Sequence, residues 1–233
     1  MKIFLSLILF FVSFSVNNFA YGHIYSETSV KNWVTRTPRR VENSMSSLVS
    51  HLTKPFDNDY NKAQAIAYWI AMRIHYDQYL YNNNEATYLR YNYRPQKPTE
   101  LLKSRAGICV DFTNLFYAMT RKANIRSKRI KGYVYQKSGR SRRLSSPKDR
   151  RDSLHAWNAF YYRGKKIYVD TTFMAGGRVE TKRRISETNR RRALNKLKRA
   201  NRLKSVKNDF DTFYFGFTYE DEKRQTGYIR EEL

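Results

Sequence analysis

Two stretches in the first half of the chain place apolar side chains at helical spacing. In residues 59–77 they recur every three or four positions, which predicts a helix with Asp59 as its N-cap and one buried face: Ala63, Ile66, Ala67, Ile70 and Ile74. A second helix is expected to begin at Cys109, soon after Gly107. Its buried stripe would consist of Val110, Leu115, Phe116 and Met119. A shorter apolar group, "SSLVSHL", could form one further helix near the N-terminus.

Strand patterns follow in the second half. Residues 129–136 alternate as a strand does, and "HAWNAFYYRGKKIYVDTTF" (155–173) predicts two strands joined at Arg163-Gly164. Residues 211–220 suggest another strand, with 221–233 as a tail. Residues 78–98, rich in Asn and Tyr, are expected to be an irregular surface loop. Helices first and strands afterwards are typical of an α+β domain.

The first 22 residues have a different character from the rest. A single Lys2 precedes an apolar run from Ile3 to Val16, and Ala20-Tyr21-Gly22 offers small residues at a cleavage position before His23. This predicts a secretory signal peptide, with a retained anchor as the alternative. No later segment is apolar enough to span a bilayer. We therefore expect a secreted or periplasmic monomer, with one domain at 23–233.

Positive charge is concentrated in two segments of this chain, whose formal net charge is +25. Residues 137–153 hold seven Lys/Arg and two Asp, and residues 178–207 hold thirteen Lys/Arg and two Glu, so together they carry +16. Such clusters attract polyanions. The candidate partners are an acidic protein, a cell-surface polymer or a nucleic acid; a merely solvated basic face is the alternative.

Cys109 is the only cysteine of 233 residues, so no internal disulfide can form. A lone cysteine can simply be a small buried hydrophobe. At the first turn of a helix, however, backbone N–H groups and the helix dipole favour a thiolate, and the Cys109 N–H could hold a developing oxyanion. Such a nucleophile still needs a base.

His155 is the best candidate for that base among the four histidines, because it stands at a strand end facing a loop. If the hairpin turns on Arg163-Gly164, Asp170 lies opposite Trp157, on the same face as His155 and diagonal to it. A three-residue loop would shift the pairing by one residue and place Asp170 on the opposite face from His155. Asp152 is the rival partner, although it lies within the basic segment.

The stretches "KAQAIAYWIAMRIHYD", "RAGICVDFTNLFYAM" and "HAWNAFYYRGKKIYVDTTF" together resemble the transglutaminase-like superfamily, a branch of the papain-like thiol enzymes. The resemblance implies that N-terminal helices, with Cys109 at a helix N-terminus, pack on an antiparallel sheet that carries His155 and Asp170. It covers about 59–173, with a possible last core strand at 211–219 and 178–207 as a basic insertion. Phe173 departs from the family pattern, which often has Trp there.

The resemblance also implies a Cys–His–Asp enzyme that acts on amide or peptide carbonyls of a protein or peptide substrate. Protease, deamidase and transglutaminase activities stay open. The alternative is a polyanion- or protein-binding module with a vestigial active site. No cofactor is expected, and one cysteine with scattered histidines offers no zinc-ligand spacing.

Overall fold

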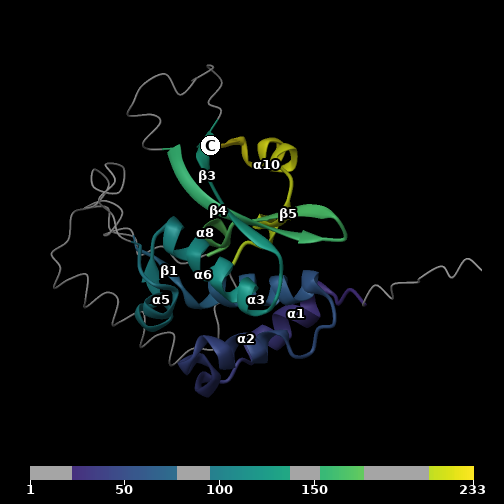
Figure 1. Cartoon of the computed structure of the whole chain (residues 1–233). Coiled ribbons are helices and arrows are strands. Elements are labelled where there is room, and N and C mark those ends of the chain that lie inside the picture. Colours follow the sequence, from purple (N-terminus) through teal and green to yellow (C-terminus); the bar gives the residue numbers. More distant parts are fainter. Residues whose placement is uncertain (1–22, 78–94, 137–152, 176–209) are drawn as a thin grey trace, which may run out of the picture.

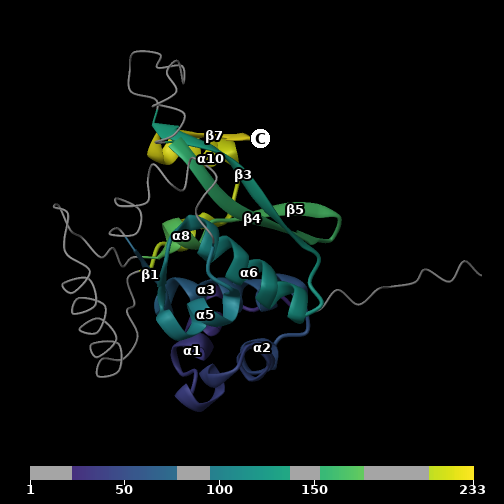
Figure 2. The ribbon, with the colours of Figure 1, turned by 60° about the vertical axis from the view of Figure 1, so that its left-hand side comes forward.

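A layer of helices packs against one face of an antiparallel sheet in the computed structural model, which describes residues 23–77, 95–136, 153–175 and 210–233 (Figures 1 and 2). The sheet has five strands in the order β6-β5-β4-β3-β7. Helix α6 lies across β3 and β4, with α3 behind it and α1 and α2 outermost. This arrangement confirms the expected α+β fold with helices before strands.

The N-terminal helices are α1 (Glu27–Thr35), a 3-10 turn η1 (Arg39–Asn43), α2 (Met45–Thr53) and the central α3 (Asp59–Arg73). The predicted apolar face of α3 is buried at every position, but the helix is enclosed on its other sides as well. Its N-cap is Asn58, whose side chain accepts a hydrogen bond from the Asn61 N–H at 2.8 Å. The Asp59 prediction is therefore wrong by one residue, and Asp59 begins the helix.

A short helix α5 (Pro98–Ser104) begins at the last residue of the predicted surface loop 78–98. Proline suits this position because the first turn of a helix has no intrahelical use for its N–H. Two short strands, β1 (His75–Tyr76) and β2 (Ala106–Gly107), then pair in parallel. They lead into α6 (Cys109–Lys122), which begins at Cys109 and buries the predicted stripe.

Strands β3 (Ser127–Gln136), β4 (Leu154–Tyr162) and β5 (Lys165–Val169) form the middle of the sheet. In the β4–β5 hairpin Tyr162 pairs with Lys165 and Asn158 with Val169, the register expected from the sequence. Arg163 and Gly164 both have positive φ, at 50° and 73°. Such a two-residue turn follows the right-handed twist of the strands, which explains why the predicted register of the hairpin is correct.

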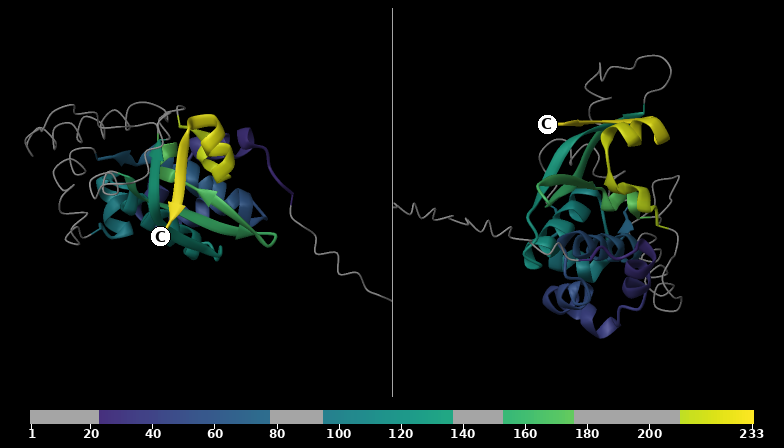
Figure 3. Two further views of the ribbon diagram at one scale, coloured as in Figure 1. Left: turned by 90° about the horizontal axis from the view of Figure 1, so that it is seen from above. Right: turned by 90° about the vertical axis from the view of Figure 1, so that its right-hand side faces the viewer.

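The C-terminal stretch differs most from expectation. Of the predicted strand 211–220, only β6 (Phe215–Phe217) is a strand; a 3-10 turn η2 (Thr212–Tyr214) precedes it, and helix α10 (Tyr219–Thr226) follows. The predicted tail is in fact most of α10 and strand β7 (Tyr228–Glu232), which pairs with β3 at the sheet edge. Figure 3 shows α10 and β7 closing the sheet at the end away from α1 and α2.

Four predictions lie wholly or largely outside the described residues: the signal peptide at 1–22, the surface loop at 78–94, the basic segment at 178–207, and all of 137–153 except Ser153. They stay predictions, as does the single domain at 23–233. Within the described part of the chain, no helix combines the length and apolar character that crossing a membrane requires.

Candidate active site

Cys109 is the first residue of α6, and a buried carboxylate fixes the start of that helix. Asp111 accepts hydrogen bonds from the backbone N–H of Ile108 at 2.9 Å and of Gln96 at 2.9 Å. A Cβ on Gly107 would lie 2.8 Å from the Cβ of Asp111, so only glycine fits before the helix without displacement. The thiol of Cys109 is buried, at the positive end of the helix dipole.

His155 on β4 joins Cys109 to Asp170. The His155 Nε2 lies 2.7 Å from Asp170 Oδ2, and His155 is also hydrogen-bonded to Cys109. Because an imidazole has two ring nitrogens and Nε2 faces the carboxylate, Nδ1 is the nitrogen left for the thiol. The three predicted site residues, from α6, β4 and the end of β5, are thus brought into one hydrogen-bonded chain.

Asp170 leaves the strand immediately after β5 and caps the short helix α8 (Thr171–Met174). Its Oδ1 accepts from the backbone N–H groups of Thr172 at 3.0 Å and Phe173 at 3.1 Å. Its Oδ2 accepts from both His155 and Arg230, the latter at 2.8 Å. Every one of these donors favours the ionised carboxylate, and the side chain is fully buried.

Arg230 is the site residue that the sequence analysis missed. It lies on β7, fully buried, and its Nε and Nη2 reach the two carboxylate oxygens of Glu222 on α10 at 2.6 and 3.0 Å. Its guanidinium also faces three aromatic rings at 4.8–5.1 Å, those of Trp157, Phe173 and Phe217. Glu222, Arg230, Asp170 and His155 therefore form a continuous buried chain of charged and polar groups.

A signal for α10 does exist in the sequence. Thr218 with Asp221 three residues later has the spacing of an N-terminal capping motif, and Gly227 at φ 73° ends the helix. The side chain of Thr218 accepts from the Asp221 N–H at 3.1 Å. Those signals predict where the helix begins and ends, but they do not predict the contact between Arg230 and Asp170.

The imidazole of His155 lies near two aromatic rings. Phe173 stacks on it with ring centres 4.8 Å apart, and Trp157 lies 6.0 Å away in a nearly parallel plane. Phe173, the departure from the family pattern, thus supplies a flat face against the histidine. The backbone N–H of the same residue binds Asp170, so one residue contacts both members of the pair.

Burial and charge oppose each other in the protonation of the pair. Burial alone would lower the pKa of His155, but the Asp170 carboxylate and the hydrogen bonds to Asp170 and Cys109 outweigh it and raise the pKa to about 9. Burial would raise the pKa of Asp170, but the positive charges of His155 and Arg230 hold it well below its usual range. The favoured state is an imidazolium beside an ionised carboxylate.

The other histidines do not join the site. His51 in α2 stacks on Trp33 of α1 with ring centres 4.7 Å apart, and His75 lies buried in β1 rather than in the predicted helix. His23 packs edge-on against Tyr25. The rival carboxylate Asp152 lies outside the described residues. Among the residues the structure describes, no cluster of three or more His, Cys, Asp or Glu could hold a metal ion.

Three comparisons with known proteins bear on this arrangement. The family model described as the transglutaminase-like superfamily matches residues 46–171, more than half of the chain. The mouse protein named kyphoscoliosis peptidase (Mus musculus) is 30% identical over 140 residues, and its human counterpart (Homo sapiens) is 30% identical over 139. Each match covers 58% of this chain but 19% of the relative, so the chain spans about a fifth of the length of these curated relatives.

Solved structures also match, at lower similarity. A candidate cysteine protease from Cytophaga hutchinsonii is 18% identical with a TM-score of 0.40, over 89% of this chain and 53% of that one. The periplasmic domain of TgpA from Pseudomonas aeruginosa is 13% identical with a TM-score of 0.39, over 63% and 50%. On the strength of the family match, this chain belongs to the transglutaminase-like superfamily.

Proposed function

We propose that this protein is a cysteine-dependent acyl-transfer enzyme that acts on amide or peptide carbonyls of a protein or peptide substrate. The observation that carries the proposal is the hydrogen-bonded chain from Cys109 through His155 to Asp170, with the 2.7 Å contact between imidazole and carboxylate. Membership of a superfamily of thiol enzymes supports it. An isolated buried thiol would need neither the histidine nor the carboxylate.

Each residue has a distinct role in this proposal. The Cys109 sulfur attacks the carbonyl carbon as the thiolate, its proton having passed to His155, and forms a new S–C bond. The imidazolium of His155 gives its proton to the departing nitrogen as the C–N bond breaks. The resulting acyl-enzyme passes to water in hydrolysis or deamidation, or to an amine in crosslinking. Neutral His155 then takes the proton of that second nucleophile, and the S–C bond breaks to release the Cys109 sulfur as the thiolate.

Asp170 orients His155 and stabilises its charged form. Arg230 acts through Asp170 and is a positioning residue, since its nearest charged contacts are carboxylates. Phe173 and Trp157 limit the rotation of the imidazole by packing on its faces. The contact of Nε2 with Asp170 leaves Nδ1 as the ring nitrogen that meets the thiol.

The direct test is mass spectrometry of a peptide library containing glutamine and primary amines after incubation with the protein. Conversion of glutamine to glutamate, isopeptide crosslinks and new peptide termini identify deamidase, transglutaminase and protease activity respectively. The Cys109→Ala and His155→Ala variants should be inactive, and Lys122→Ala, an exposed change on the same helix, should match the wild type. Equal product in the wild type and Cys109→Ala would refute the proposal.

Export and an anionic partner belong to the same proposal. The charged and apolar pattern of residues 1–22 supports a secreted or periplasmic location. The +16 carried by 137–153 and 178–207 supports docking of an acidic substrate or polymer near the site, because 137–153 immediately precedes Leu154 and His155 of β4.

A further inference from the structure

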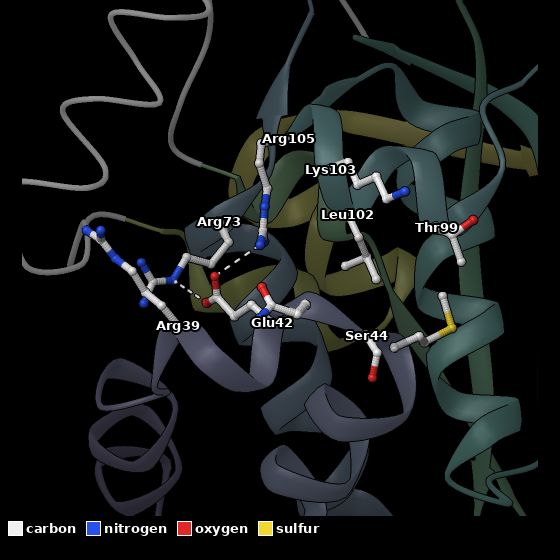
Figure 4. Close-up of a pocket in the computed structure, with 10 residues that line it drawn as sticks. Arg39, Glu42, Ser44, Arg73, Thr99, Leu102, Lys103 and Arg105 are labelled. Atoms are coloured by element: carbon white, nitrogen blue, oxygen red, sulfur yellow. Dashed lines mark hydrogen bonds and ion pairs between the residues drawn. The ribbon is translucent and has the colours of Figure 1, made fainter.

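One cavity of the described structure is strongly basic, and Cys109, His155 and Asp170 are not among the residues that line it. It has a volume of about 650 Å³ and is formed by η1, the start of α2, the end of α3 and the α5 region (Figure 4). Among the described residues, its lining contains four cationic side chains and a single carboxylate: Arg39, Arg73, Lys103, Arg105 and Glu42. The formal charge of the lining is therefore four minus one, or +3.

Glu42 is already fully engaged. Its carboxylate lies 3.4 Å from Arg73 Nε and 3.0 Å from Arg105 Nη2, and it accepts from Trp69 Nε1 at 3.1 Å. The side chains of Glu42, Arg73 and Arg105 are only 11–19% exposed. Two nearly buried guanidinium groups thus share one carboxylate, as Figure 4 shows, and one positive charge is left without a balancing anion within this cluster.

Arg105 shows the imbalance most clearly. Its guanidinium lies over the Trp69 ring at 4.8 Å, and its buried Nη1 has no hydrogen-bond partner in the part of the chain that the structure describes. Burial lowers the pKa of Arg105 and the nearby Arg73 lowers it further, against the opposing effect of Glu42. The residue also caps α5 in the left-handed region at φ 61°, where glycine or asparagine is usual. A large cationic side chain at a backbone position that favours glycine indicates that the guanidinium is needed at this place in the cavity.

We propose that this pocket binds an oxyanion group, a carboxylate or a phosphate, of a ligand whose remainder occupies the rest of the cavity. Planar guanidinium forks match both groups in geometry and charge. Asn43, Ser44 and Thr99 add neutral polar groups to the lining, and Met45 and Leu102 add apolar surface. A purely structural role for these ion pairs would explain the contacts of Glu42 with Arg73 and Arg105. It would require neither the cavity nor the two further cations in its lining, Arg39 and Lys103.

The test is calorimetric titration of the full chain with inorganic phosphate and, separately, with succinate, at constant ionic strength. Three proteins are compared: the wild type, the pocket variant Arg39→Ala/Lys103→Ala, and the control variant Arg36→Ala/Lys122→Ala. All four altered residues are exposed, and both variants lose the same charge. The comparison therefore separates the pocket from the general attraction of a basic protein for anions. The phosphate and succinate arms distinguish the two ligand classes.

We expect saturable one-to-one binding by the wild type, weakened about tenfold or more in the pocket variant and within about twofold in the control. Glu42→Gln should bind the same anion more tightly, because Arg73 and Arg105 lose their competing carboxylate. The proposal is overturned if all three proteins give the same weak, non-saturating response, or if Glu42→Gln does not tighten binding. Cys109 takes no part in these titrations, so the result is independent of the enzymatic proposal.

Discussion

The buried pair of Arg230 and Glu222 offers the sharpest test of how Asp170 is held. In Arg230→Met the carboxylate of Glu222 loses two charge-assisted hydrogen bonds, at 2.6 and 3.0 Å, while it stays fully buried. Breaking a buried ion pair from one side costs about 3–5 kcal/mol, because the remaining charge is uncompensated. We expect the free energy of unfolding of Arg230→Met to fall by that amount.

The companion variants separate a lost ion pair from lost packing. In Glu222→Met, Arg230 keeps Asp170 at 2.8 Å, so the loss should be smaller than in Arg230→Met. The double variant Arg230→Met/Glu222→Met replaces both charges by apolar side chains and should recover most of the stability, since such replacements of a buried pair are often neutral. The coupling energy between the two sites should therefore exceed about 2 kcal/mol.

Urea denaturation at pH 7 measures these differences, with Arg224→Met as the matched control. Arg224 lies on the same helix as Glu222 and pairs with Asp221 at 2.6 Å, but its side chain is 73% exposed. Its loss should change the stability by less than about 1 kcal/mol. A loss below about 1 kcal/mol in Arg230→Met, or a double variant no more stable than that single variant, would show that the buried chain of charges is not what holds β7 and α10 to the site.

Four further outcomes follow. Asp170→Asn should lower turnover by roughly 10²- to 10⁴-fold with the fold retained, and wild-type turnover there would mean that another carboxylate orients His155. The pKa of His155 is about 9 in the folded chain against 6.5 unfolded, so its stabilising contribution is complete below about pH 6.5 and is lost as the pH rises through 9. The urea midpoint of the wild type should therefore fall between these two pH values, and the midpoint of a His155→Gln variant should lack this part of the fall. Iodoacetamide should alkylate Cys109 in the folded protein at pH 7 and more slowly in His155→Ala, whereas reaction only after unfolding would identify a core thiol. Binding to an acidic polymer should weaken steeply between about 50 and 200 mM salt; neutralising Arg190, Arg191 and Arg192 should flatten that response without changing alkylation, and a flat response in the wild type would leave the charge a solvated surface.

Features set by neighbouring residues were predictable from the sequence. The start of α6 at Cys109 follows from glycine before a run with helical spacing, and the β4–β5 register follows from a turn marked by Gly164, which adopts positive φ. Because the side-chain period of a strand is two, the register also indicated that Asp170 could reach His155. The structure adds that strand pairing stops at Val169, and that Asp170 turns out of the strand to cap α8.

The misses have a common physical origin. "DEKRQTGYIREEL" is rich in charge, so it reads as a solvated tail, although Glu222 and Arg230 within it are fully buried. What buries them is a contact between residues 60 positions apart, Arg230 and Asp170, together with three aromatic rings from β4, α8 and β6. Apolar periodicity cannot reveal a charge that is buried because its partner is buried too.

That contact also bears on the chemistry. A carboxylate beside an imidazole in an apolar interior could take the proton and become neutral, because burial favours the uncharged pair. At Asp170 two backbone N–H groups and the guanidinium of Arg230 all bind the ionised form, which keeps the negative charge on Asp170 and the proton on His155. The negative charge of Glu222 in turn offsets the positive charge of Arg230, so Arg230 does not expel the proton from the nearby imidazole of His155. The predicted triad supplies the reacting groups, and Arg230, from the unpredicted pair on α10 and β7, helps to keep the negative charge on Asp170.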